Sequence, residues 1–201
     1  MVIRENIKKK YALISVYDKK KLKYLCVNLI KNNYSLISTG STGIKIRSMG
    51  FKCIDISKVT KFKEMLDGRI KTLNPLIYAS LLYVRDKEVH KKQFMSLNVP
   101  EITIVIVNLY PFDKFNKNND QNEVIEMIDI GGPSLLRAAS KNFKFITPII
   151  STNDYSKLVN NIKKNGGETD IIFRRKMAYK VFRETSDYDK KIAKWLNEIK
   201  K

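Results

Sequence analysis

The stretch ITIVIV, residues 102–107, decides the fold because it is a run of six consecutive β-branched residues. Such continuous runs are typical of strands buried on both faces, which occur in parallel sheets covered by helices. The run is far too short to cross a bilayer, which needs about 20 apolar residues. We therefore expect a central strand of a parallel sheet here, buried on both faces, with its neighbours elsewhere in the chain.

Four further short apolar segments, at residues 12–16, 34–37, 51–54 and 145–150, predict the other strands. Helical spacing predicts helices between them, and C-terminal helices over residues 169–199 with a break near Ser186 and Asp187. This alternation predicts a doubly wound α/β domain with a mostly parallel sheet. We expect residues 1–201 to form one domain, with a C-terminal helical appendage over about residues 169–201.

The charge of the chain raises nucleic acid as a partner, because 39 Lys and Arg face only 20 Asp and Glu, giving +19. The basic residues are scattered along the chain rather than gathered into one stripe. Scatter of this kind favours a solvated surface, so we expect no nucleic-acid partner. An anionic phosphate ligand would also suit this charge.

The two cysteines, Cys26 and Cys53, fit no metal-binding spacing and lie in apolar settings. Buried free thiols indicate a reducing compartment. The N-terminal residues lack the continuous hydrophobic region of a signal peptide. These features predict a cytoplasmic protein with no metal site and no membrane partner.

A phosphate site is predicted at STGST, residues 38–42, which follows one expected strand and precedes a helix. Backbone N–H groups and hydroxyls at such a junction can bind a phosphate, aided by the helix dipole. An ordinary turn with a Ser or Thr N-cap explains the same residues. Ser15 and Lys19 end the first strand at the same edge of the sheet and could join this site.

Two further motifs carry candidate polar groups. In DGRIKTLNP, residues 67–75, the alternation of Arg69 and Lys71 would point both cations the same way on an extended backbone, although a solvated basic loop is the alternative. In NLYPF, residues 108–112, Tyr110 follows the central strand. Tyr110 could bind a ligand or donate a proton, or it could simply cap the core.

The motif IDIGGPSLLRAASKN, residues 128–142, places Asp129 before a short helix and Lys141 at its end. The helix dipole alone would explain both charges. On one straight helix, twelve residues would separate them by about 18 Å. A pairing of the two therefore requires Asp129 to lie outside the helix and the chain to bend and bring Lys141 back.

These four motifs, in this order and spacing, closely resemble the IMP cyclohydrolase domain of the bifunctional purine-biosynthesis enzymes. The likeness runs from about residue 11 through RRKMAYKVFRETSDYDKKIAKWL, residues 174–196. The resemblance implies a methylglyoxal-synthase-like α/β fold. It also implies closure of 5-formamidoimidazole-4-carboxamide ribonucleotide (FAICAR) to inosine 5′-monophosphate (IMP) with loss of water, without metal or organic cofactor.

The resemblance also implies which residues act. Four positions match the family's catalytic residues, with an acid–lysine proton relay formed by the last two: Lys71, Tyr110, Asp129 and Lys141. The positions expected to bind the nucleotide are Ser15, Lys19, Ser38, Thr39, Gly40, Ser41, Thr42, Arg69, Thr72, Asn108, Gly131 and Gly132. The chain departs from the family at Asn74 and Phe143, where His is usual, and at Tyr17, where Ser is usual.

The family's larger AICAR transformylase domain has no counterpart in these residues. The resemblance therefore implies a separate protein that makes FAICAR, with a homodimer or an association with that transformylase as the expected assembly, or else a reduced copy. Two rival functions stay open: an enzyme like methylglyoxal synthase, and a non-catalytic relic that binds nucleotides or nucleic acid. The sole histidine, His90, lies outside every motif, which argues against the first rival.

Overall fold

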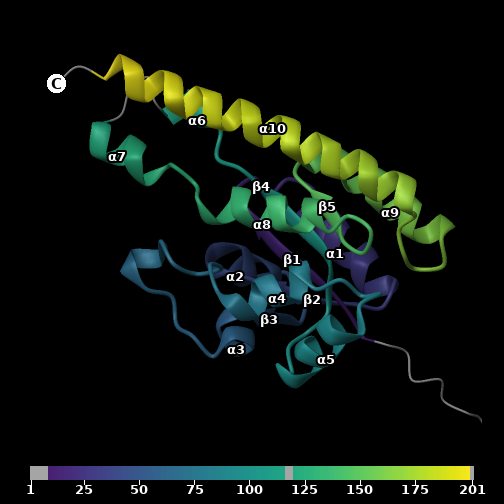
Figure 1. Ribbon diagram of the computed structural model, residues 1–201. Coiled ribbons are helices and arrows are strands. Elements are labelled where there is room, and N and C mark those ends of the chain that lie inside the picture. The colour runs from purple at the N-terminus through teal and green to yellow at the C-terminus, as the bar shows by residue number, and fades with distance from the viewer. Residues whose placement is uncertain (1–8, 116–119, 200–201) are drawn as a thin grey trace, which may run out of the picture.

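A five-stranded parallel sheet forms the centre of the computed structural model, which describes residues 9–115 and 120–199 (Figure 1). The strand order is β3-β2-β1-β4-β5, and all four strand pairings are parallel. The strands are β1 (Lys10–Val16), β2 (Tyr34–Ser38), β3 (Cys53–Asp55), β4 (Ile102–Asn108) and β5 (Thr147–Ile149). The predicted α/β class and all five predicted strands are confirmed.

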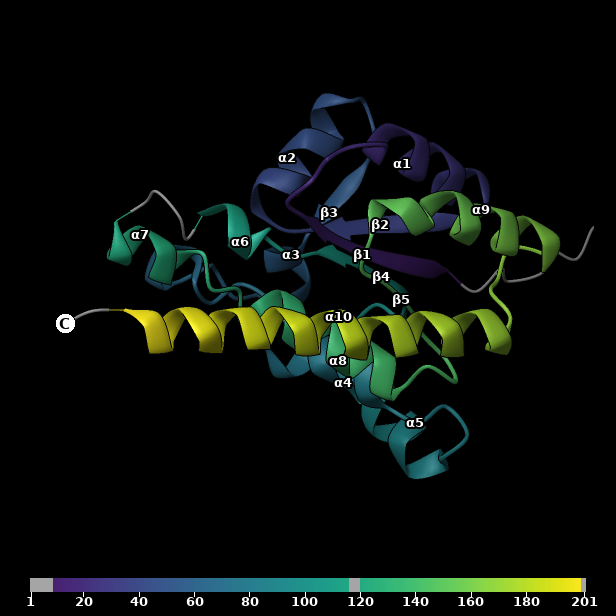
Figure 2. The same cartoon turned by 90° about the horizontal axis from the view of Figure 1, so that it is seen from above.

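Helices cover both faces of the sheet (Figure 2). One face carries α1 (Leu22–Lys31), α2 (Gly40–Ser48) and α9 (Tyr155–Lys164); the other carries α4 (Pro75–Leu82), α8 (Gly131–Lys141) and α10 (Ile171–Glu198). Shorter elements connect these: α3 (Ile56–Thr60), the 3₁₀ turn η1 (Leu66–Gly68), α5 (Glu88–Ser96), α6 (Phe112–Phe115), α7 (Gln121–Glu126) and the 3₁₀ turn η2 (Thr152–Asp154).

Strand β4 is buried on both faces, as its run of β-branched residues predicts. Ile104 and Ile106 pack into the core beneath α1 and α9, whereas Val105 and Val107 pack into the core beneath α4 and α8. Each of these four side chains is at most 2% exposed. The alternation of side chains along a strand thus lets one segment supply both cores.

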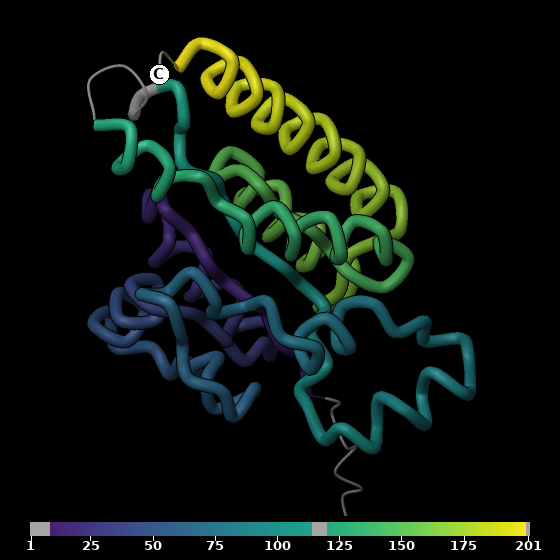
Figure 3. Tube along the Cα trace, turned by 60° about the vertical axis from the view of Figure 1, so that its left-hand side comes forward, coloured from purple at the N-terminus to yellow at the C-terminus, as the bar shows by residue number. Residues whose placement is uncertain are grey.

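The C-terminal helix α10 is a single helix of 28 residues, so the predicted break near Ser186 is wrong. Its sequence holds neither proline nor glycine, the residues that most often end a helix. One face of α10 buries Met177, Val181 and Tyr188, and the helix lies alongside α8 and β5 (Figure 3). None of the helices within the two described ranges combines the length and apolar character needed to cross a membrane.

Candidate functional site

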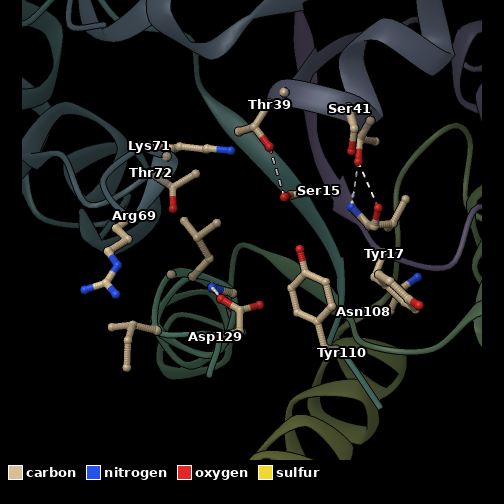
Figure 4. A pocket seen from close by; sticks show the side chains of 18 of the residues that line it. Ser15, Tyr17, Thr39, Ser41, Arg69, Lys71, Thr72, Asn108, Tyr110 and Asp129 are labelled. Carbon is tan, nitrogen blue, oxygen red and sulfur yellow. Dashed lines mark hydrogen bonds between the residues drawn. The ribbon is translucent and has the colours of Figure 1, made fainter. Parts of the chain in front are cut away.

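A cavity of about 550 Å³ opens at the carboxyl edge of the sheet, where β1 and β4 end. Ligands of doubly wound sheets bind at this edge. Five segments that lie far apart in the sequence meet here: the end of β1, the first turn of α2, the loop through η1, the residues after β4 and the start of α8 (Figure 4). Every predicted site residue lines this cavity except Ser38 and Lys141.

The first turn of α2 forms one wall. The sequence predicts that residues 38–42 precede the helix, but the helix already begins at Gly40, with Thr39 as its N-cap. The first N–H groups of a helix have no acceptor within it, and they carry the positive end of its dipole. Beside them the hydroxyls of Thr39 and Ser15 lie 3.0 Å apart, and Ser41 also faces the cavity. This wall has the donors that a phosphate needs.

Two hydroxyls of the STGST motif form hydrogen bonds with the backbone of β1 and are not free to bind a ligand in the cavity. Ser38 is fully buried and donates to the carbonyl oxygen of Ile14 at 2.6 Å, so its predicted contact with substrate is wrong. Thr42 lines the cavity, but its hydroxyl donates to the carbonyl oxygen of Val16 (2.9 Å) and accepts from the N–H of the same residue (3.1 Å). These hydrogen bonds fix the start of α2 against the end of β1.

Asn108 and Lys19 also fix the chain that follows β1. The Asn108 side chain accepts from the N–H of Asp18 at 2.9 Å and donates to its carbonyl oxygen at 3.0 Å. The Lys19 ammonium lies 3.4 Å from the carbonyl oxygen of Val16 and 3.3 Å from that of Tyr17. Both residues line the cavity, and their polar groups are engaged in shaping its wall.

The loop through η1 brings two cations to the cavity, and the Lys71 ammonium reaches the start of α2, where a Cβ on Gly40 would lie 3.5 Å from it. Lys71 is about one-third exposed, and its ammonium lies 3.4 Å from the Glu64 carboxylate. Its side chain crosses Gly68 so closely that a Cβ there would lie 2.4 Å from Lys71 Cε. Arg69 pairs with Glu126 of α7, with Nε 3.2 Å from Oε2. Both residues line the cavity, but the common direction predicted for them is not seen: Arg69 has a helical rather than an extended backbone, and its guanidinium points away from the Lys71 ammonium (Figure 4).

Asp129 lies at the floor of the cavity, just before α8. Its carboxylate accepts a hydrogen bond of 2.8 Å from the N–H of Gly132. Burial raises the pKa of this carboxyl, and the N–H groups of Gly132 and Gly131 only partly offset that rise. An aspartate with a raised pKa is better matched to proton transfer near neutral pH than an ordinary one.

Tyr110 stands beside Asp129 on the same side of the cavity (Figure 4). Burial first, and then the charges of Asp129 and Tyr17, raise the pKa of its phenol, which stays protonated at neutral pH. Its ring packs against the ring of Tyr17 with centroids 4.8 Å apart. A proton donor, Tyr110, and a proton acceptor, Asp129, therefore face the same space as the Lys71 ammonium.

Lys141 does not join this group, and the predicted pairing with Asp129 is not formed. Asp129 does lie outside the helix, but α8 then runs uninterrupted from Gly131 to Lys141. At 1.5 Å per residue its two ends are about 15 Å apart. Lys141 is exposed at the far end of α8 and does not line the cavity.

The three departures from the family pattern fall in different places. Asn74 caps α4 by accepting from the N–H of Leu76 at 2.9 Å, and Phe143 lies outside the cavity lining. Tyr17 lines the cavity and packs on Tyr110. Glu126 lines the cavity too, yet no feature of its sequence context marked it out.

Comparison with known proteins shows which families and proteins this chain is similar to. The MGS-like domain family matches residues 21–134, and the AICARFT/IMPCHase bienzyme family matches residues 139–201. The chain is 46% identical over 190 residues to the bifunctional purine biosynthesis protein PurH of Clostridium botulinum, covering 94% of this chain and 38% of that protein. It is 46% identical over 191 residues to PurH of Lactobacillus acidophilus, covering 94% and 37%.

Among solved structures, the crystal structure of ForH matches with a TM-score of 0.85 and 26% identity, covering 94% of this chain and 97% of that chain. The chain spans 38% of the length of its curated relative from C. botulinum. The match to the MGS-like domain family, over residues 21–134, covers more than half of the 201 residues. It includes all the cavity-lining residues between Thr39 and Gly132. The chain therefore belongs to the MGS-like domain family, with PurH proteins among its relatives.

Proposed function

We propose that this chain is an IMP cyclohydrolase, which closes FAICAR to IMP with loss of water. The observation that carries the proposal is the convergence of Asp129, Tyr110 and Lys71 on one cavity that the start of α2 also lines. The similarity to PurH proteins supports the same reaction. The 5′-phosphate of the nucleotide would bind at the first turn of α2, which places the base toward Asp129.

The chemistry requires a proton acceptor, an oxyanion partner and a proton donor. The carboxamide nitrogen of FAICAR attacks the formyl carbon, forms the new C–N bond and gives a proton to Asp129. The formyl oxygen, which gains the electron pair of its C=O bond, is bound by Lys71 and protonated by Tyr110. The protonated Asp129 then gives its proton to the hydroxyl, the C–O bond breaks and water leaves. The formamido nitrogen loses its proton, which restores the Tyr110 phenol, and the ring becomes aromatic.

The proposal assigns the proton transfer to Asp129 without Lys141, because the two residues lie at opposite ends of α8. The PurH relatives are named bifunctional, and we propose that an AICAR transformylase supplies FAICAR to this cavity. A homodimer or an association with that transformylase is the assembly we expect. The free thiols of Cys26 and Cys53 support a cytoplasmic location.

The purified chain should convert FAICAR to IMP, and Lys71→Ala should abolish most of that activity. Removing the ammonium leaves the developing oxyanion without its charged partner, a loss of about a hundredfold to a thousandfold for such groups. Ultraviolet absorbance during closure measures the rate. Lys63→Ala is the matched control, since Lys63 is an exposed lysine of the same loop outside the cavity lining. Absence of closure by the wild-type chain, with IMP still bound, would instead indicate a nucleotide-binding relic.

The pH dependence of closure should show an acidic limb above the usual aspartate range of about 3.9, because the pKa of Asp129 is raised. The ionised carboxylate accepts the proton, so the rate should fall as the pH is lowered through this raised pKa. Measurement of kcat between about pH 4 and pH 8 checks the limb. A limb at or below about 3.9 would contradict the assignment of Asp129 as the base.

A further inference from the structure

The hydroxyl of Tyr188 bridges the chain on both sides of Ile128, immediately before the aspartate of the cavity. It accepts a hydrogen bond from the N–H of Asp129 at 2.8 Å and donates one to the carbonyl oxygen of Met127 at 3.3 Å. Tyr188 comes from α10, 59 residues further along the chain. Tyr188 lies in the C-terminal stretch of the family resemblance, residues 174–196, but in none of the four site motifs, and it does not line the cavity.

Tyr188 is itself held firmly. Its side chain is 6% exposed and belongs to a small apolar cluster with Phe112 and Val124. The ring of Phe112 meets the rings of Tyr188 and Trp195 edge to face, with centroids 6.3 and 5.7 Å apart. Edge-to-face contacts fix ring orientation as well as adding buried area. The hydroxyl is therefore presented from a rigid support on α10.

The segment that Tyr188 holds has little regular structure of its own. Residues 128–130 lie between α7 and α8, outside any described helix or strand. The direction of the Asp129 carboxylate depends on this backbone, because the same residue must also meet the N–H of Gly132 at 2.8 Å. Both backbone groups are half-buried, and groups shielded from water are costly without partners, so the Tyr188 hydroxyl stabilises one conformation of the segment.

We infer that Tyr188 is a positioning residue, by which α10 sets the Asp129 carboxylate in the cavity. The kinetic test of this inference rests on the proposed function. The hydrogen bonds of Tyr188 to the backbone do not depend on it. The C-terminal helix thereby acts on the site without lining it. A displacement of about 1 Å at a catalytic group can cost a hundredfold in rate, so such support matters to turnover.

Tyr188→Phe keeps the ring and removes only the hydroxyl. We expect kcat to fall about tenfold or more while KM changes less than about threefold, because the phosphate wall at α2 is untouched. The acidic limb of the pH profile should move to higher pH. Without the Tyr188 hydroxyl, the segment relaxes and the Asp129 carboxylate loses its hydrogen bond from Gly132. Because that hydrogen bond lowers the pKa of Asp129, its loss raises the pKa.

Tyr179→Phe is the matched control, because Tyr179 lies on the same helix and is 68% exposed. It should leave kcat, KM and the acidic limb unchanged. Carbon-detected NMR titration of the Asp129 carboxyl in the full chain tests the inference without using activity. If the wild type fails to close FAICAR but Tyr188→Phe raises the pKa of Asp129, the proposed function fails and the positioning role stands. An unchanged Asp129 titration in Tyr188→Phe overturns the role, whatever the activity.

Discussion

Asp129→Asn should slow the closure of FAICAR by about a hundredfold or more while leaving IMP affinity nearly unchanged, as loss of a general base typically costs 10²–10⁴. Asparagine keeps the shape of the side chain and can still accept the hydrogen bond from Gly132. It has no basic oxygen to take the proton of the carboxamide nitrogen. Single-turnover rates and calorimetric titration with IMP separate the two effects.

The same substitution should not weaken the fold. The pKa of Asp129 is raised in the folded state, so its ionised form is disfavoured there, and its contribution to stability is lost as the pH rises through that pKa. Asp129→Asn should therefore keep or raise the unfolding temperature at neutral pH. Glu123→Gln, an exposed carboxylate of α7 outside the cavity lining, is the control and should leave closure unchanged. Near-wild-type turnover of Asp129→Asn would remove this residue from the mechanism.

Gly132→Ala should be as damaging to turnover as the loss of the carboxylate, although it changes no functional group. A Cβ at this position would lie 2.3 Å from Oδ2 and 3.0 Å from Cγ of Asp129, and 3.1 Å from Cγ1 of Val107. Val107, near the end of β4, is 2% exposed and packed in the core beneath α4 and α8, so it cannot give way easily. The carboxylate must therefore leave its place, and we expect kcat to fall about a hundredfold.

Overpacking also costs stability, by about 1–3 kcal/mol for a methyl group forced into a packed site. Gly43→Ala is the matched control, because Gly43 lies inside α2 and the nearest atom to its Cβ, at 3.1 Å, is the flexible end of Arg47. Alanine favours a helix interior over glycine, so this variant should fold and turn over normally. Closure by Gly132→Ala at the wild-type rate would show that the carboxylate has more freedom than these contacts allow.

The placement of residues at the sheet edge follows from local pattern. Ser15 and Tyr110 each come just after a β-branched or apolar run, and parallel strands bring their carboxyl ends to one edge. Arg69 and Lys71 reach the same cavity from an irregular loop, whose backbone the alternation of an extended strand does not describe. The break expected in α10 had no such support, since no helix-breaking residue lies there.

The hydroxyls of STGST show the limit of a motif. Ser38 and Thr39 are neighbours, yet successive side chains at the end of a strand point to opposite sides. Ser38 therefore donates into the core, to Ile14, while Thr39 faces Ser15 in the cavity. The position of STGST between a strand and a helix identified the segment. It did not separate the residues that face the cavity from those that form hydrogen bonds with the backbone.

The sequence by itself determined the parallel α/β sheet and the edge at which the cavity opens, because apolar periodicity and strand ends are local properties. The resemblance to the IMP cyclohydrolase domain implied the acid, phenol and lysine that line the cavity. Only the tertiary structure decided that Lys141 lies apart from Asp129, since the helix between them is rigid and straight. It also decided that Glu126 pairs with Arg69 and that Tyr188 holds the backbone of Asp129. Hydrogen bonds and ion pairs between segments that are 57 and 59 residues apart leave no periodic trace in the sequence, because they arise only when the segments pack together.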